Sequence, residues 1–414
     1  MAVHDEVRPG LSPWRMVVGL GLVSLLVDMV SDGAMSVGGA FLGELGASAA
    51  LVGLVTGGAS AIALALRLAT GPWADRTGAY WGFTIGGYAL SVVSVPLLAA
   101  TPLLGGAALA VGCALVLVER TGKAVRAPAK TVLLAEPATA VGKGKGFGVH
   151  KLLDQVGAFA GPLLVAAIAA ATGRYAPAFL ALLVPGLAAM ALLFWLRARV
   201  PDVRVYRPRA AAPAVPRPAA GLRALPTAVR VRFWLFAAFA ALTTFGLLGP
   251  GIISYHVARE QLVPPAVVPL VFALGMAVAA VAAPLTGWLY DHRGPRVLAA
   301  VPVVTAFVPA LALGGSLRAV LVGVALWGAA TGVQDSTVKA LVADLVPPEQ
   351  RGSAYGSFSV FQGGAAFAGA AAAGALYGRF GVLSVLVGVA QVVALGVLFA
   401  VLRRPHAPVE ERDE

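Results

Sequence analysis

Long apolar stretches alternate with short polar segments along almost the whole chain. Each stretch is close to the ~20 residues that an α-helix needs to span a bilayer. Strands of a membrane β-barrel would be about 10 residues long with alternating polarity, and no stretch alternates in that way. The pattern predicts twelve membrane-spanning helices, at about residues 14–37, 48–72, 80–101, 104–135, 147–171, 176–196, 233–254, 266–289, 296–314, 318–345, 354–376 and 381–402.

A polar segment at residues 197–232 divides these predicted helices into two sets of six. It contains six prolines and nine arginines, so it is too polar to span and too rich in proline to fold alone. We interpret it as a cytoplasmic linker, and contact with anionic lipid is an alternative role. The predicted organisation is an N-terminal half at 1–196, this linker, a C-terminal half at 233–402 and a cytoplasmic tail at 403–414.

Composition and charge support an integral membrane protein and give it an orientation. The chain is 59% hydrophobic and 12% charged, whereas soluble proteins average about 25% charged residues. With the N-terminus inside, twenty of the 31 Lys and Arg residues fall on cytoplasmic segments and four on external loops. This bias predicts a multi-pass protein of a bacterial-type cytoplasmic membrane with both termini in the cytoplasm. It also explains the net charge of +12 without a nucleic-acid partner.

Two short sequences repeat between the halves. "GPWADRTG" at 71–78 follows the second predicted helix, and "GWLYDHRG" at 287–294 follows the eighth. Both contain a glycine, an aspartate four residues later and a glycine three residues after that. Two six-helix halves related by such a repeat are typical of secondary transporters.

These repeated residues resemble the loop signature of the major facilitator superfamily. The matching residues are Gly71, Asp75, Arg76 and Gly78 in the first copy and Gly287, Asp291 and Gly294 in the weaker second copy. The resemblance covers essentially the whole chain. It implies an all-α integral membrane fold of twelve transmembrane helices in two pseudo-symmetric halves, which carries a solute by alternating access. The family signature usually ends in basic residues, whereas Ala79, Tyr80 and Trp81 follow here, so we expect a weaker conformational latch.

A second motif in the fifth predicted helix resembles one seen in drug:proton antiporters of this superfamily. It consists of Gly148, Gly157, Gly161 and Pro162. Gly157 and Gly161 are one turn apart, which lets a neighbouring helix approach closely, and the proline loosens the backbone just beyond. Val165 and Ala166 stand where the family has a closing glycine pair. Packing of small residues explains the same spacing, so the motif favours an exporter without establishing one.

The fourth predicted helix carries a stripe of charge. Glu119, Lys123, Arg126 and Lys130 are spaced four, three and four residues apart, which places them on one helical face with Arg120 beside them. Charged side chains inside a membrane face a water-filled cavity or partner charges. Lys130 lies near the cytoplasmic end and could instead be a headgroup anchor. The sequence "LLVDMVSDGA", together with "ERTGKAVRAPAK" in this helix, also resembles a poorly characterised bacterial subgroup of the superfamily, which adds no substrate.

Acidic partners for this stripe are predicted on the first and fifth helices. Asp28 and Asp32 are one turn apart in the first helix, and Asp154 lies in the fifth. We expect Asp28 to pair with Arg120 or Arg126 and to take up a proton when that partner moves, because burial and a nearby cation shift a carboxylate pKa in opposite directions. A permanent structural ion pair is the alternative. The predicted proton-coupling and cavity charges are therefore Asp28, Asp32, Glu119, Arg120, Lys123, Arg126 and Asp154.

Other polar residues inside the apolar stretches are candidates for contact with substrate. They are Gln155, Gln334, Asp335, Lys339 and Gln362. The second-half pair of aspartate and lysine is one turn apart and could equally neutralise itself. In the first half, His150 could relay protons or bond locally, and Arg67 is more easily explained as a gate or loop tether.

The sequence therefore predicts a secondary active transporter for a small organic solute. Protons are the expected coupling ion, the lipid bilayer is the expected environment, and a monomer is expected to suffice. A proton-coupled exporter is favoured. The alternatives are a proton-coupled importer of an anionic metabolite and a non-transport receptor or lipid-handling protein with the same fold. We find no metal-binding histidine pair, P-loop or nucleophile-elbow motif, so an enzyme, a metal site or a cofactor is not expected.

Overall fold

The computed structural model describes residues 10–206, 225–334, 346 and 350–403, and most of them lie in helices. The chain forms two compact units. The first comprises Met1–Ala47, Gly58–Val215 and Val263–Ala273, and the second comprises Ser48–Gly57, Pro216–Leu262 and Leu274–Glu414. The prediction of an all-α integral membrane protein agrees with these helices, whereas the exact limits of its halves stay a prediction.

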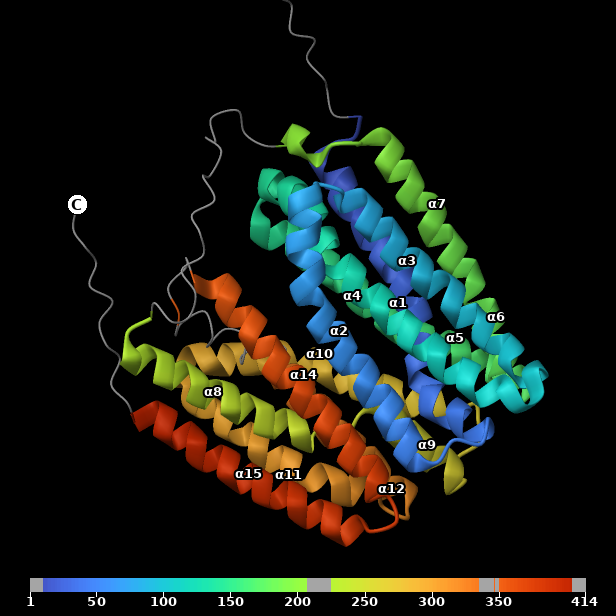
Figure 1. Ribbon diagram of the computed structural model, residues 1–414, viewed down its shortest axis with the longest axis vertical. Coiled ribbons are helices and arrows are strands. Elements are labelled where there is room, and N and C mark those ends of the chain that lie inside the picture. The colour runs from blue at the N-terminus through green and yellow to red at the C-terminus, as the bar shows by residue number, and fades with distance from the viewer. Residues whose placement is uncertain (1–9, 207–224, 335–345, 347–349, 404–414) are drawn as a thin grey trace, which may run out of the picture. The chain divides into compact units, whose positions relative to one another are not determined.

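The helices of the first half of the chain appear in blue to green in Figure 1. They are α1 (Pro13–Glu44), α2 (Ala49–Thr77), α3 (Tyr80–Leu97), η1 (Leu98–Ala107), α4 (Ala108–Val141), α5 (Lys143–Thr172), α6 (Ala176–Ala181), α7 (Leu183–Arg199) and η2 (Val203–Tyr206). Helix α1 packs along α5 and α7, and α3 packs along α4. Apolar side chains from α1, α3, α4, α7 and η2 form one buried core.

The helices of the second half run from green through yellow to red in Figure 1. They are α8 (Thr227–Gly246), α9 (Pro250–Arg259), α10 (Val268–Arg293), η4 (Gly294–Ala299), α11 (Ala300–Ala312), α12 (Leu317–Val333), α14 (Arg351–Ala375) and α15 (Phe380–Arg403). Helix α8 packs against α14 and α15, and α11 packs against α12 and α15. A second apolar core joins these helices, with several phenylalanines of α8 at its centre.

Eight helical stretches within the described residues are long and apolar enough to cross a membrane. Two of them, Tyr80–Val141 and Val268–Ala312, are 62 and 45 residues long, and each contains two α-helices joined by a 3-10 helix. The chain is therefore a multi-pass membrane protein. The number of twelve spans stays a prediction, because residues 335–345 fall outside the described residues.

One predicted span differs clearly from the structure. The seventh, expected as a single helix at 233–254, is divided into α8 and α9 by residues 247–249. Pro250 begins α9 at a position where a helix needs no N–H donor, and Gly249 precedes it in an extended conformation. The proline and its flanking glycines are visible in the sequence, but the apolar pattern runs through them without interruption.

The beginning of the predicted linker is packed against the first unit. The Tyr206 hydroxyl donates a hydrogen bond to the Leu11 carbonyl at 2.9 Å, and Val203 and Tyr206 are buried in the same apolar core as Leu11. Residues 200–206 therefore do not behave as a free tether. Residues 207–224 of the predicted linker lie outside the described residues, and its last residues belong to α8, which begins at Thr227.

Candidate functional site

Three helices of the first unit bring ionisable side chains together inside an apolar bundle. Helix α4 supplies the predicted charge stripe, α1 supplies two aspartates and α5 supplies a histidine and an aspartate. The contacts between α1 and α4 run in opposite order along the two helices: Ser24 meets Lys130, and Ser31 meets Glu119. The two helices are therefore antiparallel, and their polar faces meet over about two turns or more.

Small residues let α1 and α5 approach until their backbones touch. A Cβ atom added to Gly157 would overlap the backbone of Leu25, and one added to Gly161 would overlap the backbone of Met29. Gly33 of α1 in turn faces the backbone of Gly161. This is the close approach that the one-turn glycine spacing predicts. The other glycine of the motif, Gly148, has no such neighbour.

A proline shapes α4 in the middle of its charged stretch. Pro128 has no N–H, so it leaves the carbonyl of Ala124 without its helical donor. The Thr70 hydroxyl of α2 lies 3.3 Å from that carbonyl oxygen and 2.9 Å from the carbonyl of Leu66 in its own helix. The Thr70 side chain of α2 is thus positioned to donate to the carbonyl that Pro128 leaves without a helical donor, and it connects the two helices.

The first ion pair of the network lies within α4. Glu119 and Arg120 are neighbours in sequence, and their side chains meet at 3.0 Å between the carboxylate Oε2 and the guanidinium Nε. The Ser31 hydroxyl of α1 donates to the other oxygen of Glu119 at 2.7 Å. Glu119 is 5% exposed. A carboxylate at this depth is stabilised by a cation and a hydroxyl donor, as a buried charge requires.

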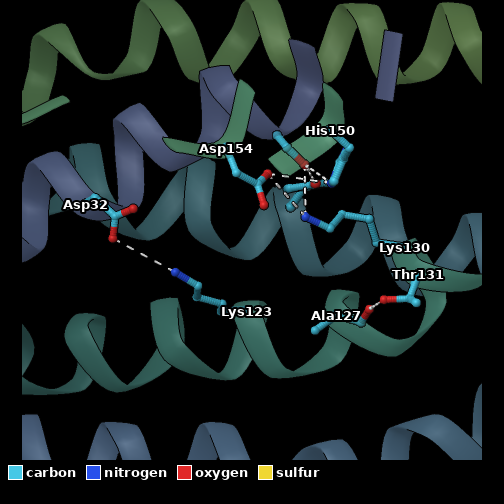
Figure 2. A network of polar contacts seen from close by, with 9 residues as sticks. Asp32, Lys123, Ala127, Lys130, Thr131, His150 and Asp154 are labelled. Atoms are coloured by element: carbon cyan, nitrogen blue, oxygen red, sulfur yellow. Dashed lines mark hydrogen bonds and ion pairs between the residues drawn. The ribbon is translucent and has the colours of Figure 1, made fainter. Parts of the chain in front are cut away.

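Two lysines of α4 reach acids on two different helices (Figure 2). The Lys123 ammonium lies 4.0 Å from a carboxylate oxygen of Asp32 on α1. The Lys130 ammonium lies 3.7 Å from Asp154 on α5. Helix α4 is therefore connected electrostatically to both of the helices that pack together through glycine.

The Lys130 end of the network also includes hydroxyl and imidazole groups. The Ser24 hydroxyl accepts a hydrogen bond from Lys130 at 2.9 Å and lies 3.1 Å from the Tyr88 hydroxyl. Nε2 of His150 lies 3.4 Å from Ser24 and 3.6 Å from Asp154, whereas its Nδ1 is buried without a hydrogen-bond partner. Figure 2 shows Lys130, His150 and Asp154 gathered at this end of the network.

Arg126 points away from the acids and toward α3. Its Nη1 donates to the Ser91 hydroxyl at 2.8 Å, and its guanidinium carbon lies 4.8 Å from the centre of the Tyr88 ring. Gly87 allows this, because a Cβ there would collide with the backbone and Cβ of Arg126. Arg126 is 3% exposed, and within the described residues it makes no ion pair.

The expected pairing of Asp28 is not present in the structure. Arg120 pairs with Glu119, Arg126 turns toward α3, and the described residues give Asp28 neither an ion pair nor a hydrogen bond. Asp28 is partly buried and lies within electrostatic range of Lys130 and Asp32. The network therefore contains one carboxylate without a direct counter-ion.

Sequence reasoning did not identify four of the polar partners. Ser24, Ser31 and Ser91 supply hydroxyls to the lysine, the glutamate and the arginine, and Tyr88 covers the arginine with its ring. A signal was available for Ser24, because it lies one helical turn before Asp28 and extends the polar stripe of α1. Tyr88 and Ser91 are three residues apart on one face of α3, but an isolated hydroxyl in an apolar helix gives no indication of its partner.

The repeated loop motif has the same backbone conformation in both copies. Gly78 follows the end of α2 with φ +64°, and Gly294 follows the end of α10 with φ +68°. Both values lie in the left-handed region that glycine adopts without strain. Gly71 faces Pro128 of α4, Arg76 and Asp291 are exposed, and Gly287 has open space where a Cβ would stand.

The motif lacks the basic residues with which the family signature usually ends, and Tyr80 at this place contacts the motif's own aspartate. The Tyr80 hydroxyl donates to the Asp75 carboxylate at 3.1 Å and so connects the end of α2 to the start of α3. In the sequence, Tyr80 only marked a departure from the family pattern. The structure gives it a contact with the motif's own aspartate.

The substrate-lining candidates lie in different surroundings. Gln334 is bound at both ends of its amide, by the Thr243 hydroxyl at 3.0 Å and by the Thr244 hydroxyl at 3.3 Å. Gln155 on α5 and Gln362 on α14 are partly buried and make no hydrogen bond within the described residues. Asp335 and Lys339 lie outside the described residues.

Comparison with known proteins gives this arrangement a context. The chain matches the family model of the Major Facilitator Superfamily twice, over residues 20–249 and 234–414. Uncharacterised proteins of Mycobacterium tuberculosis and Mycobacterium bovis are each 45% identical over 406 residues, which cover 97% of this chain and 96% of the relative.

Solved structures of transporters share the fold at low sequence identity. A mutant of the nucleoside transporter NupG has a TM-score of 0.72 at 12% identity, and the match covers 94% of this chain and 100% of that one. A bacterial homologue of the human lysosomal transporter Spinster has a TM-score of 0.68 at 16% identity, covering 95% and 98%. A mutant of the peptide transporter POT has a TM-score of 0.67 at 17% identity, covering 94% of each chain.

Proposed function

Because this chain belongs to the major facilitator superfamily, we propose that it is a proton-coupled secondary transporter that exports a small organic solute across the cytoplasmic membrane as a monomer. The observation that carries the proposal is the buried ionisable network of α1, α4 and α5, in which Asp28 has no direct counter-ion among the residues that the structure describes. We therefore propose Asp28 as the proton-binding site.

The arrangement of the helices supports a link between protonation and movement. Helices α1 and α5 touch through Gly157 and Gly161, so we propose that they move together, whereas α4 contacts their acids through lysine side chains. In the proposed cycle, Lys130 stays paired with Asp154 while Asp28 carries a proton. When Asp28 loses that proton, its negative charge attracts Lys130 away from Asp154. Helix α4 then shifts relative to α1 and α5.

The proposed direction, export, rests on the antiporter-like motif of α5, in which Pro162 follows the two packed glycines. A second candidate is proton-coupled uptake of an anionic metabolite, and a specific observation favours it: the buried guanidinium of Arg126 has no carboxylate partner within the described residues. Both candidates use the same proton site and differ in which side of the membrane releases the solute.

Transport in proteoliposomes tests this proposal. Purified protein is given pooled labelled solutes (amines, nucleosides, short peptides, carboxylates and phosphate esters), with and without a pH gradient across the membrane. We expect at least one class to show counterflow without a gradient and accumulation with one, and the sign of the gradient then gives the direction. A protein that binds a solute but never exchanges it would be a receptor and would contradict the proposal.

A further inference from the structure

The charges of the first-unit network do not balance after its ion pairs are formed. Three cations have an acid within 4.0 Å, in the pairs Arg120–Glu119, Lys123–Asp32 and Lys130–Asp154. Asp28 and Arg126 of the network, and Arg67 of the neighbouring helix α2, form no ion pair within the described residues. This part of the bundle therefore holds an excess of positive charge.

Arg126 is a buried cation with most of its donors unused. A guanidinium has five N–H donors, and the structure gives one of them a partner, the Ser91 hydroxyl at 2.8 Å. The Tyr88 ring covers the group at 4.8 Å, which holds it in place without neutralising it. Buried charges are ordinarily paired with an opposite charge. The missing partner is therefore expected to be an anion from outside the chain.

Arg67 is held close to this group by the packing of α2 on α4. Thr70 lies within hydrogen-bond distance of the Ala124 carbonyl, and a Cβ on Gly71 would lie 3.7 Å from Pro128. These contacts bring the turn of α2 that carries Arg67 beside the turn of α4 that carries Arg126. The two guanidinium groups lie within electrostatic range of each other, and the Arg67 side chain is exposed. Two like charges kept together in this way form an attractive site for an anion.

We propose that Arg67 and Arg126 bind the anionic group of the transported solute, which therefore carries a carboxylate or phosphate. This inference rests on the proposed transport function and names its substrate class. The planar guanidinium recognises both groups through paired hydrogen bonds. Arg126 offers a fixed donor set beneath Tyr88, and Arg67 offers an accessible one.

A binding experiment on the purified full-length protein in detergent tests the proposal. The probes are inorganic phosphate and malonate, with chloride at matched ionic strength and tetramethylammonium as charge controls. We expect phosphate or malonate to raise the thermal unfolding midpoint in a saturable way. Arg67→Gln and Arg126→Gln should each weaken the apparent affinity by about tenfold, the loss of one charge-assisted hydrogen bond. Arg197→Gln, at an exposed arginine in the last turn of α7, should bind like the wild type.

Several outcomes would overturn the inference. If neither phosphate nor malonate stabilised the wild type in a saturable way, the pair would bind no anion. The same would follow if both glutamine variants kept the stabilisation of the wild type. Arg67 is exposed, so its variant stays informative even if Arg126→Gln does not fold. Stabilisation by phosphatidylglycerol in the micelle, but not by soluble anions, would assign the site to a lipid headgroup instead of a solute. A protein that binds anions through both arginines but shows no pH-driven transport would leave this site standing and remove the proposed function.

Discussion

At the scale of single residues, the absence of a side chain matters as much as its presence. Gly157 and Gly161 put the backbones of α1 and α5 in contact, and this contact fixes the positions of the acids on both helices. Gly148 belongs to the same sequence motif but has free space around it. The motif therefore contains two residues with a packing role and one without.

We predict that Gly157→Ala destabilises the protein and that Gly148→Ala does not. The added methyl group at 157 would overlap the backbone of Leu25, and overpacking of this kind costs about 1–3 kcal/mol. At 148 the same change meets open space, and alanine's better helix propensity contributes up to ~1 kcal/mol. Thermal unfolding of the two variants in detergent checks this. Equal midpoints would show that the backbones of α1 and α5 are not in contact.

Residue types were predictable from the sequence, whereas their partners were not. The stripe of Glu119, Lys123, Arg126 and Lys130 follows directly from helical spacing. However, Arg126 lies about 60° around the helix axis from Lys123 at 100° per residue. That angle is enough to turn it from α1 toward the Ser91 hydroxyl and the Tyr88 ring of α3. Spacing defines a face to within such an angle, and the rotation of α4 against its neighbours depends on packing that no single-sequence pattern encodes.

At the scale of elements, α4 depends on its neighbour α2 to compensate for a proline. Pro128 removes the N–H that would bond the Ala124 carbonyl, and the Thr70 hydroxyl lies within hydrogen-bond distance of that group. The same contact keeps Arg67 beside Arg126. One interhelical hydrogen bond thus affects both the stability of α4 and the geometry of its cations.

We predict that Thr70→Val destabilises the protein by about 1–3 kcal/mol, the cost of an unsatisfied buried carbonyl. Adding Pro128→Ala to this variant supplies the missing N–H within α4, so the double variant should recover stability. A double-mutant cycle by thermal unfolding measures the coupling. Strictly additive effects of the two substitutions would mean that the threonine does not serve the proline's orphaned carbonyl.

Most helices were predictable from their apolar length, and their interruptions were not. The predicted spans agree with α3 and α15 to within four residues at each end, and α1 begins one residue before its predicted span and ends seven residues beyond it. The agreement arises because a bilayer selects a fixed length of apolar sequence. The division between α8 and α9 follows from Gly249 and Pro250, which a hydropathy window averages away. Packing of Val203 and Tyr206 onto the first unit was also missed, because a proline- and arginine-rich segment gives no apolar period.

At the scale of the whole molecule, the account predicts an orientation in the membrane. Lysine and arginine segregate twenty to four between the two sets of loops, which favours cytoplasmic termini. In a background without the native Cys113, a cysteine at Gly315 should react with an impermeant maleimide in intact cells. A cysteine at Lys145 should react only after the membrane is opened. Both positions are exposed. Reaction of the Lys145→Cys variant in sealed cells would reverse the proposed topology.

The family and the fold place this chain among transporters, and proton coupling is the central claim that goes beyond them. It depends on Asp28, the carboxylate of the network without a direct counter-ion within the described residues. An amide at this position mimics the protonated acid. The Asp28→Asn variant should therefore fold, because no described ion pair is broken, and should still exchange solute without a gradient.

The most direct measurement is pH-jump transport in proteoliposomes by Asp28→Asn beside the wild type, using the solute that the transport screen identifies. Asp202→Asn, an exposed acid outside the network, is the matched control. We predict that wild type and the control accumulate solute against its gradient after the pH jump, and that Asp28→Asn reaches only equilibrium while keeping normal counterflow. Full pH-driven accumulation by Asp28→Asn would contradict the account.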